Sequence, residues 1–302
     1  MKPKILCIVG PTASGKTSLA LKVASLLPHC TIISVDARQI YQDLSILTGK
    51  DIPDSLPRGT NIYGTDILNQ NEVSNIASFV RKIKPIISQS LVNQIPVILV
   101  GGSGLYLKAL TSNLSDIYIP PDPKLRVRLS LLDLPQLQEE LNKINPLLFS
   151  QLNHSDRLNP RRLIRHIEKT LAVKKSPVTS SPSADYLWVG LSLSKETQKK
   201  LIEDRVKKRI RDGAIDEVKQ LLASNPNPNL PLFSGLGVKE IRLFLNQGIS
   251  QEELVRLWTK SEIDYARRQM VWFNKQPSII WYDESKDRDA LAHGLANILI
   301  KK

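Results

Sequence analysis

The stretch Gly10-Pro11-Thr12-Ala13-Ser14-Gly15-Lys16-Thr17 decides the fold. It fits the pattern G-x-x-x-x-G-K-[ST], between an apolar run at residues 4–9, which predicts a strand, and residues 18–27, whose apolar spacing predicts a helix. Its glycines let successive N–H groups point at one anion, and the following helix adds its positive end. Lys16 supplies a charge, and Thr17 a hydroxyl ligand for Mg²⁺. The motif therefore predicts a phosphate-binding loop without saying whose phosphate it binds.

Further apolar runs alternate with helical segments along most of the chain. These runs, which we expect to be strands, lie at residues 31–35, 95–100, 187–193 and 278–282. Strands that alternate with helices are typical of an α/β fold, in which helices cover both faces of a mostly parallel sheet. With the loop at residues 10–17, the pattern predicts a fold like that of P-loop NTPases.

One long stretch interrupts this alternation. Residues 114–185 show helical patterns but no strand, and their borders at 119–123 and 175–183 are rich in Pro or Ser, as domain edges often are. We expect them to form an all-helical insertion. Residues 1–113 and 186–302 would then form the α/β core.

The composition points to a polyanionic partner. The 302 residues include 42 Lys and Arg against 29 Asp and Glu, a net charge of +13, and such a surplus favours nucleic acid or an anionic membrane. No apolar run reaches membrane-spanning length and no signal peptide is visible, so nucleic acid becomes the leading candidate. The two cysteines, Cys7 and Cys30, fit a reducing compartment, and we expect a cytoplasmic protein. A basic surface that binds nothing remains the alternative.

Asp36 is the acid nearest to the loop that could do chemistry. Nucleoside triphosphatases need an acid at the end of a neighbouring strand to hold Mg²⁺. The strand expected at 95–100 offers none, because it ends in Gly101-Gly102-Ser103-Gly104, whereas Asp36 follows the strand expected at 31–35. Asp36 could hold a metal or accept a proton, and its alternative role is to cap a helix.

Basic residues gather on the helix that Asn159 and Pro160 predict. Arg161, Arg165 and Lys169 follow at steps of four and line one face, a spacing that suits a phosphate backbone. Residues 123–128 add two further arginines, Arg126 and Arg128. A solvated charged face is the alternative.

A second basic and aromatic cluster lies near the C-terminus. Tyr265, Gln269 and Trp272 share a helical face, and Arg268 stands one turn from both aromatic residues. Aromatic side chains interleaved with arginines can stack on bases, although the same aromatic residues could instead belong to the core.

These residues together resemble the tRNA dimethylallyltransferases, also called tRNA isopentenyltransferases. The resemblance covers nearly the whole chain in family order. The matching segments are residues 10–17, 34–41 (SVDARQIY), 100–106 (VGGSGLY), 159–165, Arg205 with Gly213 and Glu217-Val218, 235–240 and 265–273. Three places depart from the family pattern: Leu47-Thr48-Gly49-Lys50 stands for glycine-threonine-alanine-lysine, Glu262-Ile263 for threonine-arginine, and Val271 for a threonine.

The resemblance implies a reaction and roles for individual residues. The dimethylallyl group of dimethylallyl diphosphate would move to the exocyclic amine of the adenosine 3′-adjacent to the anticodon, giving N6-dimethylallyladenosine and diphosphate. Asp36 would accept the proton of the amine, while Lys16, Arg205 and Thr17 with Mg²⁺ would stabilise the diphosphate. The tRNA, through its anticodon stem-loop, would contact Asp36, Ala37, Arg38, Gln39, Ser103, Arg126, Arg161, Arg162, Leu163, Ile164, Arg165 and Arg268. We also expect a monomer.

Two other function classes use the same loop. A small-molecule or nucleotide kinase would transfer the γ-phosphate of ATP and would not need the positive charge. A non-catalytic RNA-binding NTPase module would bind tRNA without forming a covalent product.

Overall fold

The computed structural model describes residues 2–70, 72–172, 183–224, 230–283 and 286–300. The chain divides into two compact units, of which one contains Met1–Ser112 and Ser181–Lys302 and the other Asn113–Ser180. The expected insertion at 114–185 extends too far at its end, because Asp185 already belongs to a strand of the first unit. Residues 175–182 of the expected border lie outside the described part of the chain.

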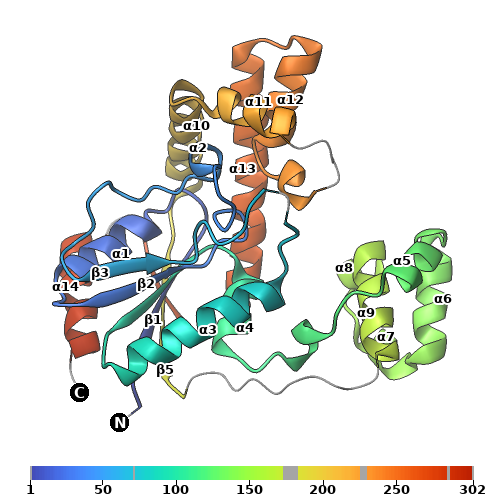
Figure 1. Ribbon diagram of the computed structural model, residues 1–302, viewed down its shortest axis with the longest axis horizontal. Helices are drawn as coiled ribbons and strands as arrows, with labels where there is room; N and C mark the ends of the chain where they lie inside the picture. The colour runs from blue at the N-terminus through green and yellow to red at the C-terminus, as the bar shows by residue number, and fades with distance from the viewer. Residues whose placement is uncertain (1, 71, 173–182, 225–229, 284–285, 301–302) are drawn as a thin grey trace. The chain divides into compact units, whose positions relative to one another are not determined.

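The first unit is built on a six-stranded sheet in the order β3-β2-β4-β1-β5-β6 (Figure 1). The strands are β1 Lys4–Val9, β2 Cys30–Ser34, β3 Thr60–Tyr63, β4 Val97–Gly101, β5 Asp185–Leu191 and β6 Ile279–Tyr282. Every neighbouring pair is parallel, which confirms the predicted fold class. The sequence did not indicate β3, because this edge strand begins with two polar residues and has no apolar run. The predicted strand at 187–193 is shifted, since β5 begins and ends two residues earlier.

Helices cover both faces of this sheet, as predicted. Helix α1 (Lys16–Ser25) and helix α14 (Arg288–Ile300) pack against each other and share a buried apolar cluster with side chains of four strands. Helix α3 (Ile76–Val92) contacts β2 and β4, and it also packs against helix α4 (Gly104–Thr111). Because both faces are covered, the central strands β1 and β4 are almost continuously apolar.

A group of helices lies beyond the carboxyl ends of the strands (Figure 1). It comprises α2 Ser45–Thr48, α10 Lys195–Arg211, α11 Ala214–Ser224, the 3₁₀ helix Pro231–Ser234, α12 Val238–Gln247 and α13 Gln251–Phe273. Helices α10 and α13 pack closely together. Ligands bind at the carboxyl ends of parallel strands in open α/β sheets, so these helices are placed to complete a site there.

The regular elements in the described residues of the second unit are all helices. It contains the 3₁₀ helix Ser115–Tyr118, α5 Pro123–Ser130, α6 Leu134–Ile144, α7 Pro146–Gln151, α8 His154–Arg157 and α9 Pro160–Leu171. The side chain of Asn159 accepts a hydrogen bond from the backbone N–H of Arg162, so the predicted cap at the start of α9 is present. A small apolar core of its own holds the unit together.

Leu163 belongs to this small core and is completely buried. It lies one turn before Ile167 on the apolar face of α9, so its side chain cannot reach an RNA in this structure. The Leu163 side chain therefore serves the core of this unit, and a contact of this residue with tRNA stays a prediction. None of the helices in the described ranges has the length and apolar character needed to cross a membrane.

Candidate active site

The loop at residues 10–17 joins β1 to α1, so the predicted strand–loop–helix arrangement is confirmed. Gly10 and Gly15 have φ angles of 146° and 79°, which favour glycine. A Cβ on Gly10 would also lie 2.5 Å from the backbone oxygen of Leu191 on the neighbouring strand. Glycine is therefore required at the start of the loop for two independent reasons.

Lys16 places its ammonium inside the curl of this loop. Its Nζ donates a hydrogen bond to the backbone oxygen of Pro11 at 2.5 Å. Although part of the residue is exposed, the surrounding protein desolvates the ammonium and lowers its pKa to about 7, helped by the charge of Arg205 and opposed by that of Asp36. An anion bound in the loop would reverse this shift, because an opposite charge favours the protonated form.

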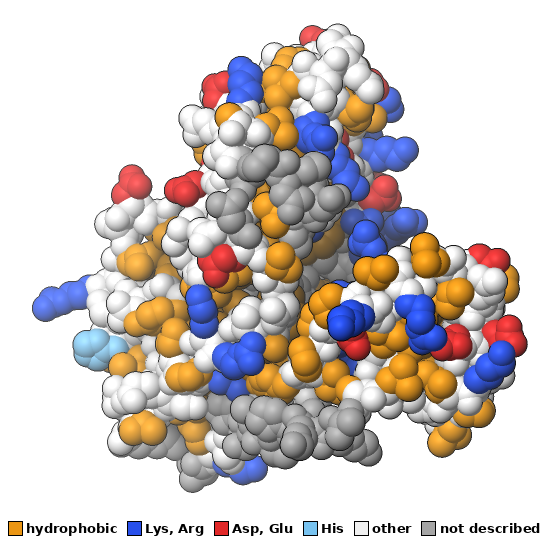
Figure 2. All heavy atoms as spheres, turned by 45° about the vertical axis from the view of Figure 1, so that its right-hand side comes forward, with side chains coloured by type: hydrophobic (Ala, Val, Ile, Leu, Met, Phe, Trp, Pro, Cys, Tyr) orange, Lys and Arg blue, Asp and Glu red, His pale blue; other side chains and the backbone are white. Residues whose placement is uncertain are grey.

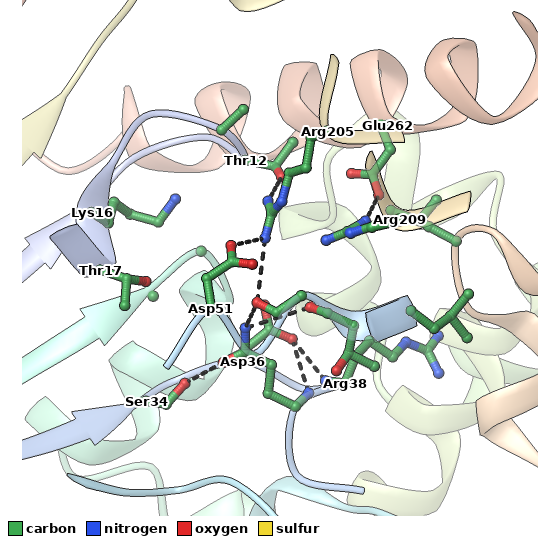
Figure 3. A pocket seen from close by; sticks show the side chains of 18 of the residues that line it. Thr12, Lys16, Thr17, Ser34, Asp36, Arg38, Asp51, Arg205, Arg209 and Glu262 are labelled. Atoms are coloured by element: carbon green, nitrogen blue, oxygen red, sulfur yellow. Dashed lines mark hydrogen bonds and ion pairs between the residues drawn. The ribbon is translucent and has the colours of Figure 1, made fainter. Parts of the chain in front are cut away.

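A cavity of about 1270 Å³ opens next to the loop within the first unit (Figure 3). Its wall is formed by the loop, the segment after β2, the segment after α2, the end of β4, and the facing sides of α10 and α13. Lys16 and Thr17 lie at the loop side, Asp36 at the end of β2, and Arg205 reaches in from α10 (Figure 3). The cavity therefore joins cations and a carboxylate from widely separated parts of the sequence.

Asp36 has a structural role as well as a place in the cavity wall. Its Oδ1 accepts hydrogen bonds from the backbone N–H groups of Arg38 at 2.8 Å and Gln39 at 3.4 Å, so it holds the turn after β2. The alternative role as a helix cap is therefore replaced by a similar one, in which Asp36 accepts the backbone N–H groups of a turn. Both bonds end on the same oxygen, so the turn does not engage Oδ2. Asp36 can therefore hold the turn and still present an oxygen to a ligand.

Arg205 ties α10 to the phosphate-binding loop. Its Nη1 donates to the hydroxyl of Thr12 at 3.1 Å, and its Nη2 donates to Asp51 at 2.7 Å and to the backbone oxygen of Gly49 at 3.3 Å. The Asp51 side chain is 67% exposed, whereas that of Arg205 is 25% exposed. An exposed carboxylate can give way to an anionic ligand, which places Arg205 ready to bind one.

Gln269 of α13 fastens the loop to the end of β4. Its Oε1 accepts from the backbone N–H of Thr12 at 2.8 Å, and its Nε2 donates to the backbone oxygen of Gly102 at 3.1 Å. A Cβ on Gly102 would lie 2.0 Å from Gln269, and one on Gly104 would lie 2.2 Å from the indole of Trp272. The glycines after β4 are therefore needed because α13 packs directly against them.

The aromatic residues of α13 are divided between packing and the cavity. Trp272 covers Gly104 and meets the ring of Phe273 edge-on, so it serves the core. Tyr265 lines the cavity, has the guanidinium of Arg268 over its ring, and hydrogen-bonds to Ser103. Burial raises the pKa of Tyr265 well above its ordinary value, so the phenol stays neutral and can act as a donor.

In the helical unit, most of the predicted RNA-binding arginines contact their own chain. Both oxygens of the buried Glu168 accept from Arg126, at 2.6 and 2.9 Å, and Oε2 also accepts from Arg165 at 3.0 Å. Arg165 also donates to the backbone oxygen of Ile119 at 2.7 Å. Burial opposes ionisation of Glu168, but hydrogen bonds from the two arginines outweigh it and hold the pKa of the carboxyl below its usual range.

The basic side chains of α9 therefore do not all have the same surroundings. Lys169 pairs with Asp116 at 2.5 Å, and Arg162 pairs with Asp156 at 2.5 Å. Arg161 is exposed and makes no ion pair within the described part of the unit. Arg165 and Lys169 thus contact residues of their own unit, which neither the expected phosphate contacts nor the alternative of a solvated charged face described, while Arg161 remains accessible. Figure 2 shows basic and hydrophobic side chains interspersed on the visible face of this unit.

Comparison with known proteins decides the family. A family model described as IPP transferase matches residues 39–276, which is most of the chain. The chain belongs to this family. It is 32% identical over 295 residues to a tRNA dimethylallyltransferase of Dictyoglomus turgidum, covering 95% of this chain and 89% of that protein. It is 35% identical over 273 residues to tRNA dimethylallyltransferase 2 of Porphyromonas gingivalis, covering 89% of each.

Two solved structures agree with the fold. The full-length tRNA isopentenylpyrophosphate transferase from Bacillus halodurans is 28% identical with a TM-score of 0.71, covering 99% of this chain and 96% of that one. A eukaryotic dimethylallyltransferase, described as acting on tRNA, is 22% identical with a TM-score of 0.80, covering 97% of this chain and 77% of that one. At this identity the second likeness supports the fold alone.

Most of the site residues that the sequence predicts in the α/β unit lie together. Those that line the cavity are Thr12, Ala13, Ser14, Gly15, Lys16, Thr17, Asp36, Ala37, Arg38, Gln39, Arg205 and Arg268. Gly10 and Pro11 are buried beneath the loop. Ser103 stands behind the wall, where its hydroxyl accepts from the backbone N–H of Ala37 at 3.1 Å. Their binding and catalytic roles stay predictions.

Sequence reasoning missed four residues of this IPP transferase site. Asp51, Arg209, Glu262 and Gln269 all line the cavity, and each bonds to a residue far away in the sequence. Glu262 was visible only as a departure from the family pattern. Gln269 was visible only as a member of the aromatic face near the C-terminus, and no local motif marks Asp51 or Arg209 as part of a site. The partners of these residues are set by how α10, α13 and the loop pack.

Proposed function

We propose that this protein transfers the dimethylallyl group from dimethylallyl diphosphate to the exocyclic amine of the adenosine 3′-adjacent to the anticodon of tRNA. The products are N6-dimethylallyladenosine and diphosphate. Membership of the IPP transferase family supports the proposal, as does the similarity to tRNA dimethylallyltransferases of other organisms. We further propose that the protein acts as a monomer in the cytoplasm, where tRNA is used.

One observation carries the proposal: a single cavity joins a cationic end to a carboxylate. Lys16, Thr17 and Arg205 line one part of it, and Asp36 lines another. A diphosphate at the cations and an amine at the carboxylate would leave the transferred carbon between them. The loop that serves nucleotides in P-loop proteins here serves the leaving group.

Asp36 supplies the proton acceptor. The exocyclic amine of adenine is a weak nucleophile, because its lone pair is delocalised into the ring, and it must lose a proton as the new C–N bond forms. The Oδ2 atom of Asp36 is not used by the turn and is available for that proton. The target base must leave its stack to reach this carboxylate, which costs a few kcal/mol, and less in an unpaired loop.

Lys16 and Arg205 stabilise the departing diphosphate, on which negative charge grows as the C–O bond breaks. Mg²⁺, when bound, would neutralise further charge on the phosphate oxygens. The residues present fit such an ion, because Thr17, Asp36 and Asp51 offer hard oxygen donors in the cavity wall. No cluster of three or more His, Cys, Asp or Glu suited to a metal occurs in the described ranges. We therefore propose that Mg²⁺ is held through Thr17 and mainly by the substrate's phosphates.

The helical unit and the excess positive charge support tRNA as the second substrate. Arg161 is exposed on α9, and Arg268 lines the cavity beside Tyr265. We propose that both contact tRNA, with Arg161 on the anticodon stem. Arg126, Arg162 and Arg165 support this surface by holding their own unit together, and Ile164 stays a candidate for contact because it is half-buried.

One assay separates this function from its competitors. The protein is incubated with unmodified tRNA and labelled dimethylallyl diphosphate in the presence of Mg²⁺, with ATP omitted. Label that appears in RNA supports the transferase. A kinase would leave the RNA unlabelled and consume ATP when it is supplied, and a non-catalytic RNA-binding module would bind the tRNA without labelling it.

A further inference from the structure

A second arginine lies beside Arg205 at the phosphate end of the cavity. Arg209 follows one turn later on α10 and lines the same cavity. A Cβ built on Gly49 would lie 2.2 Å from Nη2 of Arg205 and 2.2 Å from Nη2 of Arg209, so the two guanidinium groups meet at this glycine. In Figure 3 the guanidinium of Arg209 points toward Arg205.

Two contacts hold Arg209 in this orientation. Its Nη1 donates to Glu262 at 2.8 Å, and the two side chains are only 8% and 7% exposed. Its guanidinium also lies 5.9 Å from the ring centroid of Trp258. The Nε of Arg209 is buried with no hydrogen-bond partner in the described structure, and Nη2, which faces Gly49, has none there either. Arg209 is therefore fixed at one nitrogen and has unused donors at two others.

Two other residues shape the surroundings of this arginine. Gly49 has no side chain, and the two guanidinium groups occupy the space that a methyl group there would fill. Glu262 supplies the negative charge that pairs with Arg209. Burying a guanidinium beside another is costly, and burial and the charge of Arg205 lower the pKa of Arg209. Gly49 and Glu262 together make this arrangement possible.

We propose that Arg205 and Arg209 form one anion site at Gly49 that binds the diphosphate of the substrate through both guanidinium groups. This inference rests on the proposed function for the identity of the anion. Asp51, whose carboxylate pairs with Arg205 and is largely exposed, is displaced when the diphosphate binds. Glu262 stays, because it is buried and holds Arg209. The site thus gains a second guanidinium, whose planar fork suits phosphate oxygens.

The test measures binding of inorganic diphosphate in the presence of Mg²⁺ by titration calorimetry, which needs no transfer. Arg209→Met alone would leave Glu262 buried and unpaired and could unfold the protein. The informative variant is therefore Arg209→Met/Glu262→Thr, which removes both charges. A matched control is Lys207→Met/Glu203→Thr, which removes an exposed ion pair of the same helix and leaves the same net charge.

We expect the Arg209→Met/Glu262→Thr protein to melt near the wild-type temperature and to bind diphosphate about 10- to 100-fold more weakly, since a hydrogen bond to a charged group contributes about 1.5–3 kcal/mol. The Michaelis constant for dimethylallyl diphosphate should rise in parallel, and that for tRNA should not. Diphosphate affinity within twofold of wild type, or an equal loss in the control, would show that Arg209 is only structural. Arg209-dependent diphosphate binding without any transfer to tRNA would refute the proposed function and leave the anion site standing.

Discussion

Replacing Asp36 by asparagine separates the two roles that this side chain has. The Oδ1 atom accepts from the backbone N–H groups of Arg38 and Gln39, and an asparagine oxygen can accept the same two bonds. The turn should therefore survive. The amide cannot take a proton from the adenine amine, and loss of a general base typically costs about 10²–10⁴-fold in rate. Asp36→Ala should lose the turn's acceptor as well, at about 0.5–2 kcal/mol of stability, by analogy with capping residues.

The assay is single-turnover transfer from labelled dimethylallyl diphosphate to saturating unmodified tRNA, with tRNA affinity and melting temperature measured on the same samples. Asp36→Asn should be at least about 100-fold slower than wild type, with near-normal affinity and melting temperature. Asp36→Ala should be equally slow and should melt earlier. Transfer by Asp36→Asn within a factor of a few of wild type would remove Asp36 as the base. An earlier melting of Asp36→Asn would mean that the turn depends on the charge.

Four further substitutions test other parts of the structure. Because the pKa of Lys16 is about 7, the free side chain is mostly neutral above pH 7 and must take up a proton when the diphosphate binds. The affinity of the wild-type protein for dimethylallyl diphosphate should therefore fall between about pH 7 and about pH 9. Lys16→Ala should bind dimethylallyl diphosphate weakly, and its affinity should not depend on pH in this range. If calorimetry and kinetics show unchanged affinity and turnover for Lys16→Ala, the loop serves another ligand. Arg161→Ala should raise the Michaelis constant for tRNA and reduce the slope of log affinity against log salt by roughly 0.7–0.9, whereas Arg165→Ala should mainly lower the melting temperature. An unchanged slope for Arg161→Ala would exclude a phosphate contact there. Gly104→Ala should destabilise the protein by about 1–3 kcal/mol in urea unfolding because it forces Cβ into Trp272, and wild-type stability would show that α13 adjusts freely.

The parts of the fold that the sequence predicted are those specified by neighbouring residues. Strand β1 and the loop after it follow from one apolar run and one motif, and β1 has the predicted bounds. The cap at Asn159 is likewise a local arrangement. Edge strand β3 was missed because only part of it is buried, so its residues are not uniformly apolar.

Site residues could be predicted where the family pattern includes them. They were harder to predict where the packing of distant elements determines which groups a side chain contacts. Asp36 and Lys16 stand beside local signals, and both line the cavity. Arg165 was expected to bind RNA, but its guanidinium donates hydrogen bonds to Glu168 and to the backbone oxygen of Ile119. The row of positive charges along α9 could not reveal these acceptors, because one of them comes from a segment far earlier in the chain.

The hydrogen bonds by which Gln269 holds the phosphate-binding loop affect when a growing chain can become active. The phosphate-binding loop is made well before α13, but its Thr12 N–H is fastened by a residue 257 positions later. The helical unit is complete long before that, since Leu129, Leu163 and Ile167 of its core precede β5. A ribosome-bound chain could thus present a folded helical unit while its loop still lacks the side chain that fixes it. Competence to hold a diphosphate should arise late, when α13 has left the exit tunnel.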